Sequence, residues 1–219
     1  MSQHKHIQQK LANLRQHLVL LLQRTNDIDS SGSTTLQSVI KRLGTPGNVK
    51  NRASQANPLA DLLPQIKQAN ATLPLMCQNM VDNVIELANH LPWYQRPVAN
   101  NQGFMASHVN AQIIGPEGLE VRQDLIVGVT LMRPNIDYPD HHHEPEEIYL
   151  VLSDGRWRQE NGDWHTPGLG GLVYNSSDLM HGMKSVNTPL LAIWCLPLDK
   201  PFIPFSAPIS APIGSDPTA

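Results

Sequence analysis

The second half of this 219-residue chain consists of short apolar stretches separated by turn signals. Of all its sequence features, this pattern restricts the possible fold most. From about Phe104 onward, the stretches are punctuated by turn-forming pairs: Gly115-Pro116, Pro134-Asn135, Asp154-Gly155, Asn161-Gly162 and Gly170-Gly171. Many short strands with frequent turns are typical of a β-sandwich or a β-barrel. We therefore expect a β-barrel over about residues 101–200.

The first hundred residues have a helical pattern instead. Apolar residues recur at spacings of three and four along one stretch: Ile7, Leu11, Leu14, Leu18 and Leu21. Further helices are expected over residues 34–43, 59–66 and 80–91, and the polar residues 48–57 are expected to form a loop. The chain then divides into a helical region at 1–100, the barrel at 101–200 and a proline-rich tail at 201–219, which we expect to be extended.

Composition argues against several classes of function. The formal net charge is -3 and there is no basic run, which gives no support to nucleic-acid binding or to an anionic membrane surface. No stretch approaches the roughly 18 apolar residues of a membrane span, and the apolar run 18–22 is too short for a signal-peptide core. Because Cys77 and Cys195 do not suggest a disulfide framework, a cytoplasmic location is expected.

Residues 138–149 read Y-P-D-H-H-H-E-P-E-E-I-Y, and here residue type and spacing specify chemistry. Alternate residues of a strand share a face, and four of these residues are odd-numbered: His141, His143, Glu147 and Tyr149. If Pro145 does not break the register, all four point the same way. The other face is then left to apolar residues that can pack: Ile148, Leu150 and Leu152. This parity favours Glu147 over Glu146 as a metal ligand.

His181 is expected to complete the site from another strand, because a hairpin after the turn-rich stretch 168–171 can return it to the first pair. Three imidazoles and a carboxylate suit Fe, Zn, Mn, Co or Ni. Such a ligand set leaves coordination positions open, which indicates substrate binding rather than a closed structural site. His142 is expected to point away, Glu144 and Glu146 to be exposed charges, and His165 to be a turn residue.

These residues resemble the cupin superfamily. His141-x-His143-x3-Glu147 matches the first cupin motif, and Gly170 together with His181 matches the second. Several turn positions depart from the motifs, at Asn135, Gly155, Ser176 and Asp178. The resemblance implies a mainly β fold: a cupin barrel, which is a double-stranded β-helix or jelly roll, preceded by a helical region.

A narrower resemblance includes the tyrosines. The pattern Tyr138-x2-His141-x-His143-x3-Glu147-x-Tyr149, with His181 downstream, resembles the cupin-type dimethylsulfoniopropionate (DMSP) lyases, which also have N-terminal helices. The resemblance implies a carbon–sulfur lyase that cleaves DMSP by β-elimination to dimethyl sulfide and acrylate. It implies one divalent transition-metal ion (Fe2+, Zn2+, Mn2+, Co2+ or Ni2+), held by His141, His143, Glu147 and His181. It also implies a homodimer, since cupins are often dimers.

The implied chemistry assigns further roles. Tyr149 shares the ligand face and is our candidate for the base, and Tyr138 is the second candidate or orients the substrate. The sulfonium of a small zwitterionic substrate needs an aromatic or polar wall, which a cation–π contact can supply. Among the available aromatic residues, Trp157 and Trp164 included, we predict Trp194 and Tyr174 as substrate-binding residues.

Other functions remain open at this point. A cupin dioxygenase can hold iron with the same four ligands, and it would consume oxygen. A metal-dependent isomerase or epimerase could act on a sugar or on another small carboxylate. A non-catalytic cupin would bind a small molecule tightly without turnover. Since function resides in the site and not in the fold, the four ligands alone do not separate these classes.

Overall fold

The computed structural model describes residues 3–24, 28, 30–53, 56–71, 74–98 and 101–201. Apart from Pro201, the proline-rich tail lies outside these residues. Helices dominate the first part of the chain and are joined by two short 3-10 turns: α1 (Gln3–Arg24), α2 (Ser30–Leu43), η1 (Ala60–Leu62), α3 (Leu63–Asn70), α4 (Leu75–Leu87), η2 (Ala88–His90) and α5 (Gln102–Ser107). All of the predicted helices are present, and the expected loop at 48–57 contains the two-residue strand β1 (Asn48–Val49).

Two sheets form most of the second part, and their strands pair antiparallel except for the short parallel pair of β2 and β3. The larger sheet has seven strands in the order β1-β3-β2-β4-β10-β6-β8, and the smaller has three in the order β5-β9-β7. The bounds of these strands are β2 (His108–Gly115), β3 (Glu120–Val121), β4 (Leu125–Met132), β5 (Asp137–His141), β6 (Glu147–Val151), β7 (Gly155–Gln159), β8 (Leu172–Asn175), β9 (His181–Ser185) and β10 (Leu190–Pro197). The structure therefore has the expected mainly β fold with N-terminal helices.

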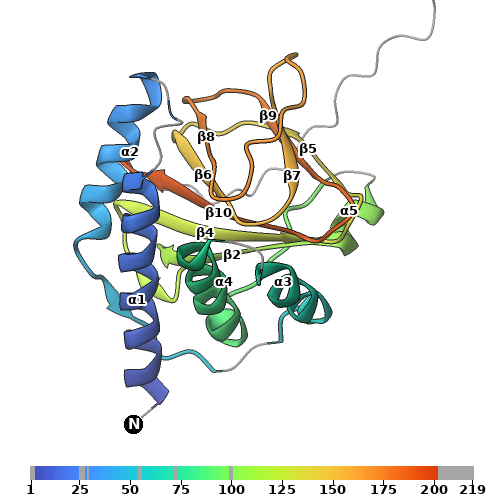
Figure 1. Cartoon of the computed structure of the whole chain (residues 1–219). Helices are drawn as coiled ribbons and strands as arrows, with labels where there is room; N and C mark the ends of the chain where they lie inside the picture. The colour runs from blue at the N-terminus through green and yellow to red at the C-terminus, as the bar shows by residue number, and fades with distance from the viewer. Residues whose placement is uncertain are drawn as a thin grey trace, which may run out of the picture.

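The larger sheet is buried on both faces. Helices α1 to α4 lie on one side of it, and the smaller sheet lies on the other (Figure 1). The central strands β2, β4 and β10 are consequently buried almost throughout, which explains the nearly continuous apolar sequences of β4 and β10. Strand β6 shows how one strand serves both sides. Its residues Ile148 and Leu150 pack with the helices, while Tyr149 and Val151 pack between the sheets.

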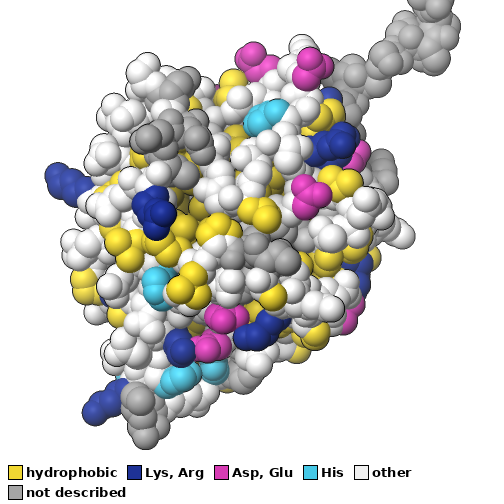
Figure 2. All heavy atoms as spheres, in the orientation of Figure 1, with side chains coloured by type: hydrophobic (Ala, Val, Ile, Leu, Met, Phe, Trp, Pro, Cys, Tyr) yellow, Lys and Arg dark blue, Asp and Glu magenta, His cyan; other side chains and the backbone are white. Residues whose placement is uncertain are grey.

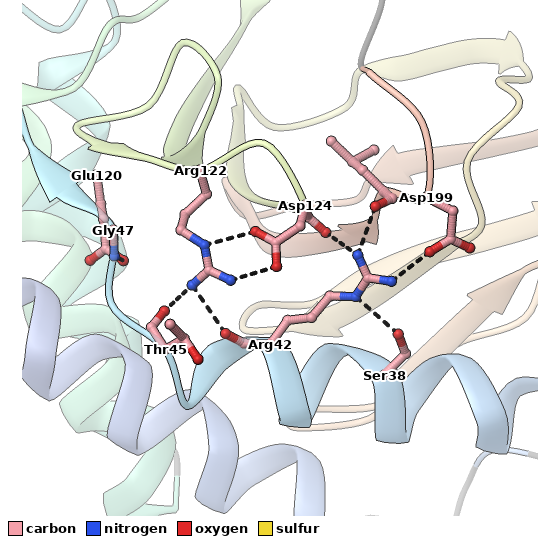
Figure 3. A network of polar contacts seen from close by, with 9 residues as sticks. Ser38, Arg42, Thr45, Gly47, Glu120, Arg122, Asp124 and Asp199 are labelled. Carbon is pink, nitrogen blue, oxygen red and sulfur yellow. Dashed lines mark hydrogen bonds and ion pairs between the residues drawn. The ribbon is translucent and has the colours of Figure 1, made fainter.

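Helix α2 is fastened to the barrel by two arginines (Figure 3). Arg42 donates hydrogen bonds to the carbonyl oxygens of Asp124 (2.5 Å) and Leu198 (2.7 Å). Arg122 donates to both carboxylate oxygens of Asp124 and to the carbonyl of Thr45, just beyond the end of the helix. Arg122 also donates to the carbonyl of Arg42 (3.1 Å), one of the last-turn carbonyls that a helix leaves without an intrahelical partner. The C-terminal end of α2 is thereby fixed to the ends of β4 and β10.

On the face that Figure 2 shows, basic and acidic side chains are interspersed, and no large patch of a single charge is visible. None of the helices in the described ranges combines the length and the apolar content that crossing a membrane requires.

Candidate active site

Three buried histidines meet between the two sheets. His141 ends β5, His143 lies in the turn that follows, and His181 begins β9. One ring nitrogen from each lies within 4.8 Å of the others. His141 and His181 are register partners across the β5–β9 pair, so the sheet itself brings the downstream histidine to the first pair, as expected.

The orientation of the three rings suits a metal ion. Each Nδ1 is directed at a backbone carbonyl two residues away: His141 at Pro139 (2.9 Å), His143 at Pro145 (2.8 Å) and His181 at Leu179 (2.8 Å). Because a carbonyl only accepts, each Nδ1 carries the proton and each Nε2 presents a lone pair. This second hydrogen bond is the usual way in which proteins fix the tautomer of metal-binding histidines.

Glu147 supplies a carboxylate to the same centre. Its Oε2 lies 3.1 Å from Nε2 of His181 and 3.4 Å from Nε2 of His143. Two ligand atoms that each lie about 2.1 Å from one ion, at a right or tetrahedral angle, are about 3.0–3.4 Å apart. Burial acts to raise the pKa of Glu147, but the neighbouring His143 outweighs it and holds that pKa well below its usual range. The three histidines thus form a compact group that could hold a metal ion, and Glu147 lies at ligand-to-ligand distance from two of them.

The condition that Pro145 leaves the strand register intact is not met. Residues 142–146 form a loop that bends at 144–145, so His141 and Glu147 lie on β5 and β6, which belong to different sheets. Parity still holds within β6, where Glu147 and Tyr149 face the centre and Ile148 faces the helices. His142 is exposed and points away as expected, with Nδ1 3.5 Å from Asp178. The strand break brings the ligands together from two sheets rather than from one.

The metal centre opens into a pocket of about 320 Å³ between the sheets. Six of the predicted site residues line it: Tyr138, His141, His143, Glu147, Tyr149 and Trp194. His181 lies beside them through its contacts with Glu147 and His141. Five further residues, which the sequence did not indicate, also line the pocket: Tyr94, Arg96, Asn110, Thr130 and Met183.

Tyr174 is not among the pocket residues, contrary to the prediction that it binds substrate. On β8 the side chain of Val173 packs between the sheets, so Tyr174 lies on the opposite face, against α2. A Cβ at Gly32 of α2 would lie 2.8 Å from the Tyr174 ring. The Tyr174 hydroxyl donates a hydrogen bond to Oε1 of Glu146 (2.7 Å), and Thr35 of α2 donates to Oε2 (2.5 Å). Glu146 is therefore a partner of α2 rather than the exposed charge that we expected.

The three tryptophan candidates differ in whether they line the pocket. Trp157 is buried in the core between the sheets, and Trp164 lies between the cations of Arg158 and Lys184, 4.7 and 4.3 Å from its ring centroid. Neither lines the pocket. Trp194 does, and its register partners are Tyr149 on β6 and Gly128 on β4.

Of the three tyrosines that line the pocket, the two predicted ones, Tyr149 and Tyr138, have different surroundings. Burial and the negative charge of Glu147 raise the pKa of Tyr149 well above its usual value. Burial also raises the pKa of Tyr138, but the positive charge of Arg96 and a hydrogen bond from Asn110 act against it. Nδ2 of Asn110 donates to the Tyr138 oxygen at 3.3 Å, so the Tyr138 proton is directed elsewhere.

A relay of hydrogen bonds links Tyr138 to Trp194 along the pocket floor. Nε1 of Trp194 donates to Oγ1 of Thr130 (3.1 Å), which donates to Oδ1 of Asn110 (2.6 Å). Polar side chains in the otherwise apolar strands β2 and β4 are the one sequence signal that could have revealed Asn110 and Thr130, since a buried polar group needs a partner.

A buried group of three histidines and a carboxylate between two mainly antiparallel sheets defines the class of this protein, a cupin barrel with a candidate metal centre. The particular family follows from sequence comparison. The chain belongs to the DMSP lyase family, whose model matches residues 31–192 and so includes every predicted ligand.

Individual relatives agree with this membership. The putative dimethylsulfoniopropionate lyase DddL of Cereibacter sphaeroides is 28% identical over 137 residues, and the chain spans 58% of that relative's length. A solved structure from work on the DMSP lyases RdDddP and RnDddQII has a TM-score of 0.67 at 18% identity, covering 88% of this chain and 94% of the other. The DMSP lyase DddQ from Ruegeria pomeroyi has a TM-score of 0.56 at 23% identity, covering 74% and 82%. At these identities the two structures establish the shared fold.

Proposed function

We propose that this protein is a metal-dependent lyase that cleaves DMSP to dimethyl sulfide and acrylate. The observation that carries the proposal is the position of Tyr149, which lies two residues from Glu147 on β6 and lines the same pocket. Family membership supports the same reaction. In this β-elimination a base takes a proton from the α-carbon. The electron pair released from that C–H bond forms the new double bond. The electron pair of the breaking carbon–sulfur bond leaves with dimethyl sulfide.

Four residues would hold one divalent ion, among Fe2+, Zn2+, Mn2+, Co2+ and Ni2+: His141, His143, Glu147 and His181. A bound divalent ion withdraws electron density from the substrate carboxylate and favours the ionised form of a neighbouring phenol. The protein's part is to direct Nε2 of each imidazole toward the centre and to keep Glu147 anionic. The first is supported by the carbonyl partners of the three Nδ1 atoms, and the second by the lowered pKa of the carboxyl group.

We assign the base to Tyr149. It shares one face of β6 with Glu147, so an ion held by Glu147 would favour the ionised form of this phenol, and its register partner Trp194 lines the same pocket. Tyr138 is assigned an orienting role, because its oxygen already accepts from Asn110 and its own proton is directed elsewhere. With the α-carbon beside Tyr149, the sulfonium is placed toward Trp194, where a cation over an indole is worth about 0.5–2 kcal/mol.

The test is product analysis under anaerobic conditions, with enzyme loaded with each candidate ion in turn. The proposal predicts acrylate in the proton NMR spectrum, formed at the same rate with and without oxygen. Acrylate formation that requires oxygen would favour a cupin dioxygenase and overturn the lyase assignment. Binding of DMSP without any product would favour a non-catalytic cupin.

A further inference from the structure

We propose that Arg96 is a carboxylate-binding residue, and that the site selects small molecules whose anionic end fits between this guanidinium and the metal centre. The inference rests on the proposed function and deepens it, because it names the group that recognises one end of the substrate. Arg96 lies in the segment between η2 and α5, is 9% exposed and lines the same pocket as Glu147 and Tyr149.

Charge balance is the first argument. Among the described residues that line the pocket, Arg96 is the single Lys or Arg, and Glu147 is the single carboxylate. The carboxylate of Glu147 already lies against His143 and His181. An ion held there would add a second cationic centre to a buried pocket, and buried charges are costly unless they are paired. A substrate carboxylate would offset the positive charge that the ion adds.

The position of Arg96 in the pocket wall is the second argument. It lines the pocket together with residues on several of its sides: Tyr94, Tyr138, His141, His143 and Tyr149. Since Arg96 is buried, it belongs to the wall of this space rather than to the solvent-exposed surface. Its planar set of N–H donors matches the two oxygens of a carboxylate, which makes arginine the usual residue for such recognition.

The backbone around Arg96 is held firmly. Tyr94 forms an isolated bridge to Asn110 of β2, with hydrogen bonds of 2.8 Å in both directions. The Arg96 amide donates to Nε2 of His108 (3.0 Å), and His108 in turn stacks on Phe104 with ring centroids 3.7 Å apart. This support fixes the backbone from which the Arg96 side chain reaches the pocket, as a binding residue requires. The same strand, β2, carries Asn110, so Arg96 and Tyr138 are positioned together.

The arrangement also sets the direction in which a substrate binds. With its carboxylate at Arg96 and the metal centre, a three-carbon acid places its α-carbon near Tyr149 and its far end toward Trp194. A neutral amide of the same shape would lose the paired charges. The structure therefore points to small carboxylates, with a cationic or apolar far end, as the ligand class of this pocket.

The experiment measures binding of propionate, which has no leaving group, and of its neutral analogue propionamide, by NMR titration. Metal-stripped protein is compared with protein loaded with Zn2+, in the wild type, Arg96→Met, Arg96→Lys and Arg133→Met. Arg133 is the matched control, because its guanidinium is paired with Asp61 on the surface. Metal content is measured in every sample, so that loss of the centre is not mistaken for loss of Arg96.

We expect the wild type to prefer propionate to propionamide even without metal. Arg96→Met should weaken propionate binding about 10–100-fold, the range for a charge-assisted hydrogen bond, and should leave propionamide binding unchanged. Arg96→Lys should restore part of the difference, and Arg133→Met should behave as the wild type. For DMSP turnover, Arg96→Met should raise KM more than it lowers kcat.

If Arg96→Met binds propionate with wild-type affinity, the proposal is overturned, even if turnover is lost. Arg96 would then affect turnover only through Tyr138 and would not bind the carboxylate. Should Arg96→Met not fold, equal binding of propionate and propionamide by the wild type would overturn it as well. The outcome is independent of the lyase assignment. A protein that binds propionate through Arg96 and releases no dimethyl sulfide contradicts the proposed function and leaves the carboxylate site standing.

Discussion

Nδ2 of Asn175 donates a hydrogen bond to Oε2 of Glu147 at 3.1 Å, across the register pair that joins β6 and β8. Gln159 donates to Oδ1 of the same amide (2.8 Å), which turns Nδ2 toward the carboxylate. Removing a residue that orients a metal ligand costs about 10–100-fold in metal affinity. We expect this loss for Asn175→Leu in a competition titration with a chelator. Asn161→Leu, in an exposed turn, is the control and should bind as the wild type.

The adjacent carboxylates Glu146 and Glu147 should respond differently to the same substitution. Glu147→Gln removes the buried anion beside His143 and His181, so metal content after dialysis should fall. Glu146→Gln should keep the metal, because its partners are Thr35 and Tyr174 on the α2 side. It should instead lower the free energy of unfolding by about 1 kcal/mol, the usual value for a hydrogen bond. Loss of metal in Glu146→Gln would contradict the assignment of ligands.

His108 should make the fold sensitive to acid. Burial lowers the pKa of this imidazole to about 4, and both ring nitrogens are occupied, by the Phe104 carbonyl and by the Arg96 amide. In the unfolded chain the pKa is about 6.5, so as the pH falls from 6.5 toward 4 the unfolded state takes up a proton that the folded state does not. Above pH 6.5 neither state is protonated there and the penalty vanishes.

The measurement is the free energy of unfolding in urea at pH 7.5 and at pH 5. His108 should account for about 2 kcal/mol of the loss between the two values. In His108→Gln that part of the loss should disappear, although the variant starts from a lower stability at pH 7.5. The exposed His165 serves as the comparison, since His165→Gln should retain the full pH dependence. An unchanged slope in His108→Gln would show that the imidazole is not held neutral.

Gly128 makes room for the Trp194 indole. A Cβ at this position would overlap the six-membered part of that ring, which therefore has to move in Gly128→Ala. We expect the substitution to destabilise the fold by about 1–3 kcal/mol, as overpacking does, to raise KM for DMSP and to change the near-ultraviolet circular dichroism of the tryptophans. In Gly103→Ala, where the nearest atom would be 3.9 Å away, KM should stay at the wild-type value.

Local pattern was sufficient for the parts of the molecule that depend on local spacing. The α1 face of Ile7, Leu11, Leu14, Leu18 and Leu21 is buried as the periodicity predicts. Glu147 and Tyr149 both face the pocket because residues two positions apart on a strand lie on the same face of the sheet. The same rule, had it been applied to β8, would have placed Tyr174 opposite Val173 and away from the pocket.

What local pattern could not supply is pairing between distant segments. Arg96 reaches the pocket because Tyr94 bridges to Asn110, and nothing in the sequence around residue 96 indicates that bridge. The turn at Pro145 assigns His141 and Glu147 to different sheets, although their spacing also fits one strand. The contact of Glu146 with Thr35 joins residues far apart in the chain. These features follow from how the sheets and helices pack, and the spacing of residues in one sequence does not reveal that packing.

The most direct test of the account is headspace measurement of dimethyl sulfide from purified protein and DMSP. It should be run with a bound divalent ion, after chelation and in Tyr149→Phe. We predict dimethyl sulfide and acrylate in equal amounts from the loaded wild type, none after chelation, and recovery when the ion is restored. Tyr149→Phe should retain its metal and lose at least about 100-fold in rate, the usual contribution of a general base. No dimethyl sulfide from the metal-loaded wild type would contradict the lyase assignment, and full activity in Tyr149→Phe would contradict the choice of base.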